Sequence, residues 1–481
     1  MARMAGIVSA VVLAAGSASR FGGAKLLARL AGRPVLQHVL DALADGGVDD
    51  VVVVLGADGR AAEIEAAIDW RAERRVRNPD PARGLASSLH AGLAAVPPDA
   101  AGVLVALGDQ PGLQPAVVRA LVAAPFDPDR PVVVPRYAGD DARNPVRLER
   151  SAFTLVDDAT GDRGLGPVLA ARPELVREIP VEGTNPDVDR PEDLVTAAAA
   201  VWAGRVRSDR EQVERFREVP DGRDFYAPVR SIFRADPDRT DEPVLDALRA
   251  MVAPGETWLD IGAGAGRYAL PLARLAGRVI ALDPSESMLD ALREDAAEHG
   301  IDNVETLLGR WPPDASTPAL GAALGPFPCA DVALIAHVGY DIEAIVPFVE
   351  AMEAATRRLC VAVLMERQPG SLAAPLWPPV HGEERVILPG LHELVELLRL
   401  RGRAPTVEMY RRDPRRFDSR DALLGLVRRQ LWVAEGSAAD ERLQAALDGL
   451  VVEAPGGFRL GVDGVGDVGI VSWTIARRGA G

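Results

Sequence analysis

Short apolar runs alternate with stretches of helical periodicity along about the first 200 residues of the chain. Four runs have the length and composition of buried strands, and the segments between them place apolar side chains three or four residues apart, as amphipathic helices do. The strands are expected at 8–15, 50–55, 102–107 and 131–135, and the helices at 35–43, 61–68, 87–95, 116–122 and 191–202. This alternation predicts a mainly parallel sheet with helices on both faces.

A second alternating unit begins near residue 240. Its strands are expected at 257–261, 278–282, 304–307, 330–335, 358–364 and 468–475. Between the two units, residues 203–225 are rich in arginine and acids and read as a linker plus a solvated helix. Because no internal repeat is visible and the glycine loops differ, we expect a fusion of two domains, 1–203 and 240–481, joined by a linker or helical segment at 204–239.

Composition narrows the choice of partners and compartment. A chain of 481 residues is too long for one hydrophobic core. Its net charge of −16 argues against nucleic acid or an anionic membrane as the main partner. Only Cys329 and Cys360 are present, which fits a reducing cytoplasm and predicts an inert core thiol at Cys329. The apolar run at 4–15 reads better as a first strand than as a signal peptide, and no stretch approaches the roughly 20 apolar residues of a membrane helix.

The first candidate site is a glycine-rich loop that follows the first expected strand. Residues 13–25 read Leu-Ala-Ala-Gly-Ser-Ala-Ser-Arg-Phe-Gly-Gly-Ala-Lys. Glycine lets backbone amides approach a phosphate chain closely, and Arg20 and Lys25 add positive charge where a triphosphate would lie. Lys25 is the only lysine among 54 basic residues, so this position favours a compact ammonium over a planar guanidinium. The loop lacks the ending of a Walker loop, and a flexible surface turn is the structural alternative.

An acid follows the third expected strand, in the sequence Leu107-Gly108-Asp109-Gln110-Pro111. The carboxyl ends of strands are where open α/β sheets bind ligands. A carboxylate at this place can hold Mg²⁺ against phosphate oxygens, or it can simply cap a helix.

These motifs are followed in order by Asn-Pro-Val-Arg-Leu at 144–148 and Asp-Val-Asp-Arg-Pro-Glu-Asp-Leu at 187–194. Together they resemble the family of molybdenum cofactor nucleotidyltransferases over about residues 6–200. Residues 84–89 also resemble the family's base-contacting segment. Cytidylyltransferases of this family read Leu-Ala-Ala-Gly where guanylyltransferases read Leu-Ala-Gly-Gly, so Ala15 implies CTP as the substrate.

The resemblance also implies roles for individual residues. Lys25 and Arg20 would neutralise the β- and γ-phosphates, and Asp109 and Asp189 would share Mg²⁺, with Asp187 as the alternative ligand. The terminal phosphate of the acceptor would attack the α-phosphate in line and release pyrophosphate. The nucleotide itself would be contacted by Lys25, Asp109 and the segments Leu13, Ala14, Ala15, Gly16, Ser87 and Ser88.

Molybdenum cofactor is the acceptor that the family implies, with a transient contact to a molybdoenzyme. One departure weakens this assignment. The family loop that resembles residues 161–164 usually continues with Ala-Arg, but here Leu165-Gly166 follows, so an expected basic group is missing. A sugar phosphate or polyol phosphate is the alternative acceptor.

The second candidate site begins at residues 258–266, which read Trp-Leu-Asp-Ile-Gly-Ala-Gly-Ala-Gly. The next strand ends at Asp283, where an acid can accept hydrogen bonds from both hydroxyls of a ribose. The two features together resemble class I methyltransferases over about residues 240–365. A dinucleotide-binding loop would have glycine at position 267, where Arg267 stands, so NAD binding is the weaker alternative.

This second resemblance implies S-adenosylmethionine as the methyl donor. On the acceptor side, His337 and Tyr340 follow the fourth strand and would position or deprotonate the acceptor, although His337 could instead serve only the loop backbone. A sensor that binds the donor without transferring its methyl group is the non-enzymatic alternative. The donor would be bound by Asp260, Gly262, Gly264, Gly266, Asp283, Pro284, Met288 and Arg310, with Trp311 near the adenine.

The sequence therefore predicts a cytoplasmic bifunctional transferase with two doubly wound α/β domains. The N-terminal domain is expected to hold a Rossmann-like nucleotidyltransferase sheet, and the C-terminal domain a class I methyltransferase sheet. The expected ligands are CTP, Mg²⁺, a phosphorylated small molecule and S-adenosylmethionine, with no nucleic acid and no membrane.

Overall fold

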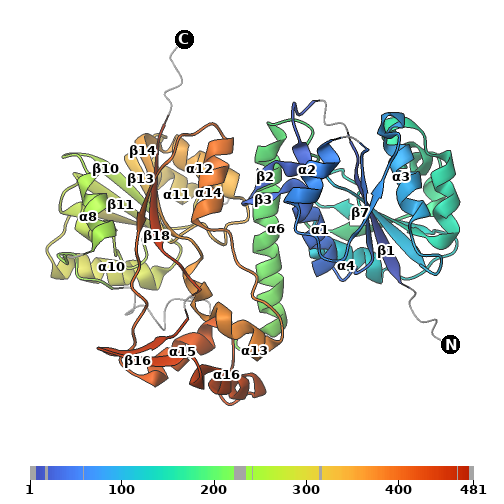
Figure 1. The fold of residues 1–481 in the computed structure, drawn as a ribbon. Coiled ribbons are helices and arrows are strands. Elements are labelled where there is room, and N and C mark those ends of the chain that lie inside the picture. The colour runs from blue at the N-terminus through green and yellow to red at the C-terminus, as the bar shows by residue number, and fades with distance from the viewer. Residues whose placement is uncertain are drawn as a thin grey trace, which may run out of the picture. The chain divides into compact units, whose positions relative to one another are not determined.

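The computed structural model describes residues 7–16, 20–57, 59–220, 234–240, 242–313, 317–462 and 464–475. The chain divides into two compact units, an N-terminal unit (Met1–Gly204) and a C-terminal unit (Arg205–Gly481), and each is described by itself (Figure 1). Residues 17–19 of the glycine-rich loop and residues 221–233 of the expected linker lie outside the described residues.

The N-terminal unit is built on a seven-stranded sheet of order β5-β4-β1-β6-β8-β7-β9. Only β8 runs antiparallel to its neighbours, and the other paired strands are parallel. The strands are β1 (Val8–Ala14), β4 (Val51–Leu55), β5 (Arg74–Arg77), β6 (Gly102–Leu107), β7 (Val132–Tyr137), β8 (Val146–Glu149) and β9 (Val176–Val181), and a small hairpin pairs β2 (Arg29–Leu30) with β3 (Arg33–Pro34).

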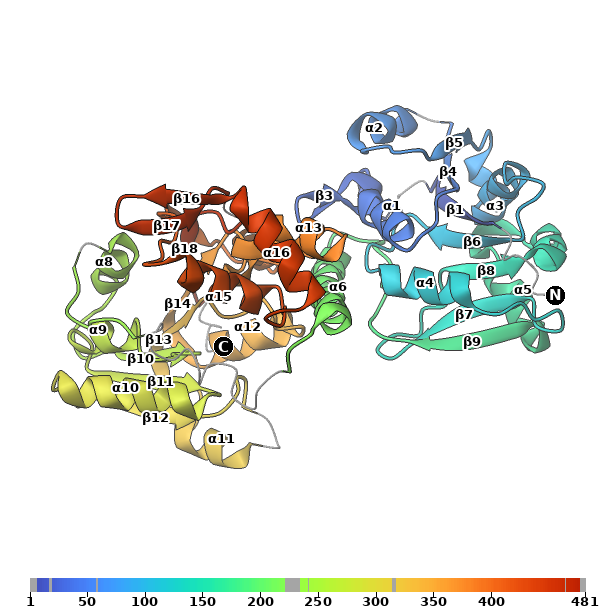
Figure 2. The same ribbon diagram turned by 90° about the horizontal axis from the view of Figure 1, so that it is seen from below.

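Both faces of this sheet are covered, because successive strand residues point to opposite sides. Ala10 and Val12 of β1 pack with α1, α2 and α4, whereas Val11 and Leu13 pack with α3 on the other face. Figure 2 shows α1, α3 and α4 beside the sheet. The helices are α1 (Val35–Asp45), α2 (Arg60–Ala67), α3 (Leu85–Ala94), α4 (Pro115–Ala123) and α5 (Gly166–Ala170).

The C-terminal unit holds a second seven-stranded sheet, of order β12-β11-β10-β13-β14-β18-β15. The last strand in sequence, β18, is antiparallel to β14 and β15, and the remaining pairs are parallel. The strands are β10 (Thr257–Ile261), β11 (Arg278–Asp283), β12 (Val304–Leu308), β13 (Ala330–Ala336), β14 (Thr356–Met365), β15 (Thr406–Tyr410) and β18 (Val468–Thr474).

Helices also lie on both sides of this second sheet. Trp258 and Val279 of the sheet pack with Leu245 of α8 and Leu270 of α9. Figure 1 shows α8 on one side of the sheet and α12 and α14 on the other. The helices of this part are α8 (Pro243–Ala250), α9 (Ala269–Ala273), α10 (Glu286–Glu298), α11 (Pro318–Leu324), α12 (Ile345–Ala354) and α14 (Leu391–Leu400). The expected fold class, two mixed α/β sheets, is confirmed.

A small lobe of the C-terminal unit has a core of its own. Leu376, Trp377, Leu423, Leu431 and Leu443 are buried in it. Its elements are α13 (Trp377–His381), α15 (Arg420–Gln430), α16 (Ala438–Asp448) and the hairpin of β16 (Val451–Ala454) with β17 (Gly457–Leu460).

One long helix, α6 (Asp193–Phe216), contains the division between the units. The sequence predicts its first part but ends it at 202 and expects a solvated segment beyond. Val206, Gln212 and Val213 are instead buried, and Gln212 donates to Glu383 Oε1 at 2.7 Å. The amphipathic pattern was hidden because arginines and acids surround these few apolar positions.

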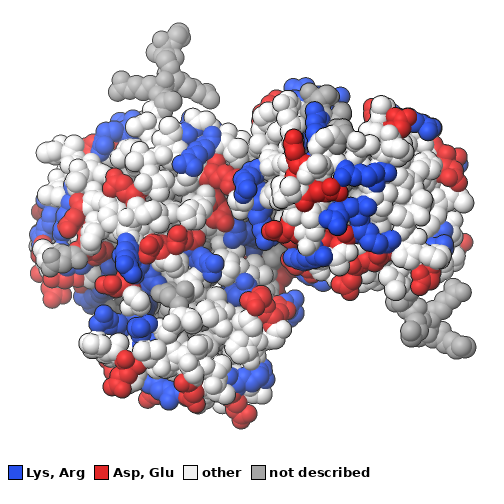
Figure 3. Space-filling model, in the orientation of Figure 1, with Lys and Arg blue, Asp and Glu red and all other residues white. Residues whose placement is uncertain are grey.

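No helix among the described residues has the length and apolar character needed to cross a membrane. Acidic and basic side chains lie interspersed on the face of the molecule that Figure 3 shows.

Candidate active sites

Lys25 stands between two carboxylates at the carboxyl edge of the N-terminal sheet. Its ammonium donates to Asp109 Oδ2 and, over 3.1 Å, to Asp189 Oδ1. The Lys25 side chain is only 12% exposed, whereas Arg20, whose guanidinium lies 3.7 Å from Asp189 Oδ2, is 73% exposed. Burial would lower the pKa of Lys25, but the two carboxylates outweigh burial and hold that pKa above its usual value. The structure thus brings four of the predicted site residues together.

Backbone contacts explain how distant segments meet here. Lys25 begins a short 3-10 helix after the loop that follows β1, and Asp109 follows β6, the parallel neighbour of β1. Gly108 N donates to Leu13 O at 3.0 Å, and Val188 N donates to Asp109 O at 3.0 Å. The second contact fixes Val188, and therefore its neighbours Asp187 and Asp189, against the end of β6.

A third carboxyl, Asp187, adds to the negative charge of this cluster. Burial raises the pKa of Asp187 to about 6, and repulsion from Asp109 and Asp189 acts in the same direction, opposed by Gln110 and Lys25. Within the described part of the chain, no group of three histidine, cysteine or acidic side chains has the arrangement of a metal site. A divalent ion here would therefore rely on two carboxylates and on ligands from its substrate.

A hollow opens beside Lys25, and it contains an arginine that the sequence motifs do not include. Arg60, at the start of α2, lines this hollow together with Ala15, Gly16 and Lys25. Arg60 lies 35 residues beyond Lys25 in the sequence, so only the fold brings the two cations to one place. The other residues around the hollow are Ala14, Ala24, Leu26, Gly56, Ala61 and Ile64.

The expected base-contacting segment lies at the start of α3. Asn78 Nδ2 donates to Ser87 Oγ at 2.8 Å and to Ser88 Oγ at 2.9 Å, so a buried amide orders both hydroxyls. Gly84 precedes the helix with φ of +88°, and a Cβ there would collide with Gly161. The contact joins this segment to the 161–164 loop, which the sequence relates to the acceptor. Asn78 is a further residue that the motifs did not reveal.

Arg147, part of the motif at 144–148, has a structural position. It is 5% exposed, and its Nη1 donates to the carbonyls of Leu121 and Ala124 at the end of α4, at 2.8 and 2.7 Å. Its Nη2 pairs with Glu149 at 2.6 Å. The motif at this place therefore ties β8 to α4.

In the C-terminal unit, the glycine loop follows β10. Gly262, Gly264 and Gly266 all have positive φ, between +54° and +82°, which side-chain-bearing residues rarely adopt. A Cβ at Gly262 would clash with Val338 and one at Gly266 with Leu270, whereas a Cβ at Gly264 would meet nothing within 4 Å. The loop therefore needs glycine for packing at its ends, and at Gly264 it leaves backbone open to a ligand.

Two acids lie side by side at this loop. Asp283 Oδ2 accepts from Gly264 N and its Oδ1 from Ser285 N, both at 2.8 Å. Asp260 is 2% exposed, and its Oδ1 has no hydrogen-bond partner in the part of the chain that the structure describes. Burial, together with repulsion from Asp283, raises the pKa of Asp260 to about 7. A buried carboxyl oxygen without a donor is rare in folded proteins and is often found at functional positions.

The remaining residues that are predicted to bind the methyl donor differ in how exposed they are. Met288 is 2% exposed and packs with Ala265 and Ala291, while Pro284 and Arg310 are exposed. Gly309 N donates to Asp283 O at 3.0 Å, which places Arg310 next to the end of β11.

His337 and Tyr340 both follow β13, but they differ in whether their side chains are already hydrogen-bonded within the protein. Met365 N donates to the Tyr340 hydroxyl at 2.7 Å, and burial raises the pKa of this phenol far above its usual value. Tyr340 therefore braces the end of β14 and is not offered to a substrate. His337 has φ of +59°, and its Nδ1 is buried with no hydrogen-bond partner among the described residues. The expected inert thiol, Cys329, is half-buried, and burial raises its pKa.

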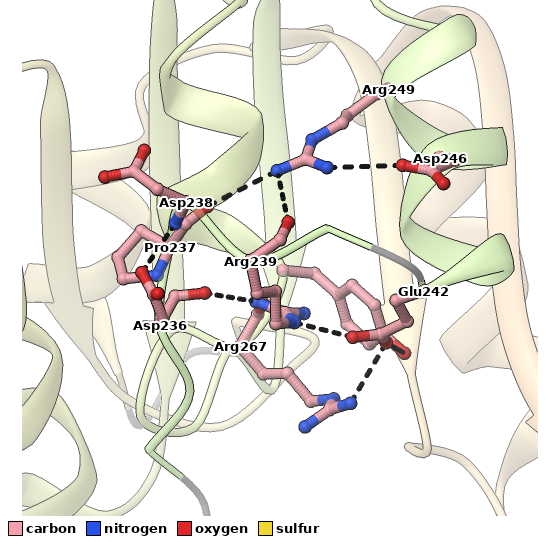
Figure 4. A network of polar contacts seen from close by, with 9 residues as sticks. Asp236, Pro237, Asp238, Arg239, Glu242, Asp246, Arg249 and Arg267 are labelled. Atoms are coloured by element: carbon pink, nitrogen blue, oxygen red, sulfur yellow. Dashed lines mark hydrogen bonds and ion pairs between the residues drawn. The ribbon is translucent and has the colours of Figure 1, made fainter.

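An ion-pair network fastens the chain before α8 to the residue after the glycine loop (Figure 4). Glu242 accepts from Arg239 Nε at 2.5 Å, from Arg267 Nη2 at 3.0 Å and from the Tyr268 hydroxyl at 3.3 Å. Arg239 Nη2 also donates to Arg267 O at 2.8 Å. Burial opposes ionisation of Glu242, but the two arginines outweigh it and hold its pKa below the usual value.

Two family models match the chain. One, described as a MobA-like NTP transferase domain, covers residues 10–176, and the other, described as a methyltransferase domain, covers residues 259–318.

Individual relatives match the N-terminal unit. Nicotine blue oxidoreductase of Paenarthrobacter nicotinovorans is 34% identical over 205 residues, which span 39% of this chain and 94% of that relative. Bifunctional enzyme IspD/IspF of Caulobacter vibrioides is 32% identical over 211 residues, 43% of this chain and 48% of that one. The crystal structure of Rv0371c from Mycobacterium tuberculosis H37Rv is 33% identical, with 41% of this chain and 99% of that chain covered and a TM-score of 0.37.

Proposed function

Because the chain belongs to the MobA-like NTP transferase family through residues 10–176 and carries a methyltransferase domain, we propose that it is a bifunctional transferase. Its N-terminal unit transfers a cytidylyl group from CTP to a phosphorylated acceptor, in first place molybdenum cofactor, and releases pyrophosphate. Its C-terminal unit transfers a methyl group from S-adenosylmethionine to a small molecule.

The proposed cytidylyl transfer is supported above all by the position of the Lys25 ammonium between Asp109 and Asp189. Two carboxylates that face one cation offer the hard oxygen ligands that Mg²⁺ prefers, and Mg²⁺ commonly takes one or two carboxylates with substrate phosphates completing its shell. The donor set therefore fits Mg²⁺, with Asp109 and Asp189 as its ligands. When bound, the ion would offset the charge that develops on the phosphate oxygens.

The chain's own groups would supply the rest of the chemistry. Lys25 and Arg20 place positive charge beside the loop after β1, and the backbone of 13–16 approaches the nucleotide at Gly16. The Ser87 hydroxyl and Ser88 would contact the base from α3. Transfer of this kind depends on positioning and charge neutralisation more than on a covalent intermediate, so no nucleophilic side chain is required.

Two alternatives concern this first activity. Leu165-Gly166 follows the 161–164 loop where Ala-Arg is usual in the family, and the missing basic group favours a sugar phosphate or polyol phosphate as the second candidate acceptor. The similarity to a relative named as an oxidoreductase makes hydride transfer the other candidate. Lys25, Arg20 and Arg60 support binding of a phosphate chain, which a nucleoside triphosphate and a dinucleotide cofactor both contain, so the family match over residues 10–176 and not the charge favours nucleotidyl transfer.

The second activity is supported by the paired acids Asp260 and Asp283 at a loop whose Gly264 is open to a ligand. A methyl donor held by its ribose and its methionine amine suits these two carboxylates. A sensor would bind the donor in the same way, and only transfer of label separates the two.

The test uses the purified full chain with Mg²⁺. CTP and GTP are each supplied with molybdenum cofactor, with sugar phosphates or with no acceptor, and pyrophosphate release and the nucleotidylated product are measured. We expect turnover with CTP and molybdenum cofactor. Preference for GTP refutes the cytidylyl assignment, and turnover with sugar phosphates alone supports the second acceptor. Reduction of a nicotinamide or flavin substrate without pyrophosphate release would support the oxidoreductase.

A further inference from the structure

His337 is a half-buried residue with one ring nitrogen, Nδ1, that is buried without a hydrogen-bond partner among the described residues. It directly follows β13, and its backbone N–H donates to Val363 O at 2.8 Å. Its φ of +59° lies in the left-handed region, where a residue with a side chain is strained. Strain together with a buried unpaired atom is typical of functional positions.

The position of His337 is next to the methyl-donor loop. β10 and β13 are parallel neighbours, and Ile261 pairs with Ile335, so the residues after the two strands meet at one edge. Val338 fills the space that a Cβ at Gly262 would need. His337 therefore lies at the edge where a methyl group would be delivered.

Charged side chains from three other segments act electrostatically on the pKa of His337. Burial, with smaller contributions from Arg267 and Arg412 and against the opposing effect of Glu242, lowers the pKa of His337 to about 4. Glu242 is itself paired with Arg239 and Arg267, so the surroundings are positive (Figure 4). At neutral pH the imidazole is consequently neutral, and it is too weak a base to take a proton from an amine or a phenol.

We propose that the C-terminal unit methylates the carboxylate of a small organic acid, with His337 Nδ1–H positioning this carboxylate and Arg412 balancing its charge. The proposal rests on the proposed methyltransferase function and names its substrate class. Arg412 belongs to the segment between β15 and α15, and its Nε donates to Gly466 O at 3.1 Å, which holds the side chain near the sheet edge.

The reaction balances without a base. One carboxylate oxygen forms a bond to the methyl carbon, and the carbon–sulfur bond of the sulfonium breaks with its electron pair passing to sulfur. The products are a methyl ester and a neutral thioether, and no proton moves. His337 donates its hydrogen bond to the other carboxylate oxygen and so orients the attack.

The charge pattern selects this acceptor over others. Methylation of an amine moves the positive charge of the sulfonium onto nitrogen, so the product is still a cation beside two guanidiniums, which is unfavourable compared with an uncharged product. A phenol or alcohol needs a base, but neither the weakly basic His337 nor the Tyr340 hydroxyl, which is already hydrogen-bonded, can act as one. A carboxylate is ionised at neutral pH and loses its charge during the reaction.

The first experiment identifies the chemical class of the product. The full chain is incubated with methyl-tritiated S-adenosylmethionine and the small-molecule fraction of a bacterial extract, and the products are then treated with base. A methyl ester releases volatile tritiated methanol, whereas methyl ethers and methylamines keep the label. Volatile label supports the inference. Base-stable label overturns it and leaves the methyltransferase intact, while no labelled product, with donor binding retained, overturns both.

The second experiment examines His337 itself. Histidine ¹⁵N spectra, assigned through His337→Asn, are recorded between pH 5.5 and 8. We expect a neutral ring with its proton on Nδ1 throughout, and titration near pH 6.5 or higher would overturn the positioning role in favour of a base.

Variants separate positioning from folding. His337→Gly keeps the backbone unstrained, and we expect it to lower acceptor kcat/KM about tenfold to a hundredfold, with donor affinity within about threefold. His337→Asn tolerates positive φ and keeps an N–H donor, so it should recover part of the loss. His299→Asn, at the end of α10, is the matched control and should behave as the unmodified protein. Equal loss of donor binding in both His337 variants would show a merely structural role.

Discussion

Replacing Lys25 by arginine is a small chemical change with a large expected effect. The ammonium lies between Asp109 and Asp189 with a side chain that is 12% exposed, so its surroundings leave little free space. Arginine carries the same charge, but its guanidinium is wide and planar and spreads that charge over several hydrogen-bond donors. A guanidinium at this place would have to displace one carboxylate or move out into the hollow that Arg60 also lines.

The magnitude follows from what one well-placed charge contributes. Removing a single stabilising donor from a transition state of this kind costs about 2.7–4 kcal/mol, or a hundredfold to a thousandfold in rate. Because Lys25→Arg keeps the charge but misplaces it, and also shifts a carboxylate that would bind Mg²⁺, we expect a loss of about a hundredfold in kcat.

The assay is steady-state pyrophosphate release from the full chain with CTP, Mg²⁺ and acceptor. Donor binding by the C-terminal unit is measured on the same sample and should be unchanged, which controls for folding. Arg20→Lys is the matched comparison, because Arg20 is 73% exposed and should tolerate exchange. A Lys25→Arg rate within about threefold of the unmodified enzyme would show that Lys25 is a bystander.

Four further changes have expected outcomes. Arg60→Ala should raise KM for the nucleotide about tenfold, since a charged hydrogen bond contributes about 1.5–3 kcal/mol, and an unchanged KM would remove Arg60 from the site. Asp283→Ala should weaken S-adenosylmethionine binding at least about tenfold in calorimetry while leaving pyrophosphate release intact. The pKa of Asp260 in the folded protein is about 7, well above its usual value, so its contribution to stability is present at acid pH and is lost as pH rises through 7. Asp260→Asn should therefore raise the melting temperature of the ligand-free protein at pH 8 but not at pH 4. Equal shifts at both pH values would contradict this. Arg147→Lys should lower the free energy of unfolding by about 2–4 kcal/mol in urea titrations, because it loses the carbonyls at the end of α4.

Much of the fold was predictable because buried parallel strands are apolar throughout. β1, β4, β6 and β10 were expected within a residue or two of their ends for that reason. The strands that were missed carry polar residues: β8, inside its sheet, reads Val-Arg-Leu-Glu, and β5, β9 and β15 lie at sheet edges. β5 reads Arg-Arg-Val-Arg, and β15 is exposed or half-exposed along its length, so neither resembles a buried run. An edge strand has a neighbouring strand on one side only and is less buried, so its sequence carries more polar residues than that of a central strand.

The candidate sites were predictable where a motif is continuous in sequence, and not where the fold assembles them. The two glycine loops and the acids that end their strands are visible in single segments. Arg60 and Asn78 belong to no motif, because only strand order brings their loops to the site. Tyr340 was assigned a chemical role from its place after β13, yet its hydroxyl accepts the Met365 amide. Sequence position shows proximity to a site, but not what a side chain already binds.

The use of basic residues in this chain supports the role proposed for Lys25. Arginines here repeatedly satisfy backbone carbonyls: Arg147 binds those at the end of α4, and Arg205 donates to Ile387 O from two nitrogens, at 3.0 and 2.8 Å. A fork with five donors suits such carbonyl clusters, and a lysine would leave several of them unpaired. Lys25 differs in that one ammonium meets two carboxylates, those of Asp109 and Asp189. Where oxygens of one charge surround a single point, a compact ammonium is the better cation, because all of them can approach it. The carboxylates around a metal ion and the oxygens of a phosphate chain also bring negative charge close to one point, so a lysine at this one position is consistent with a site that binds both a metal ion and a phosphate chain.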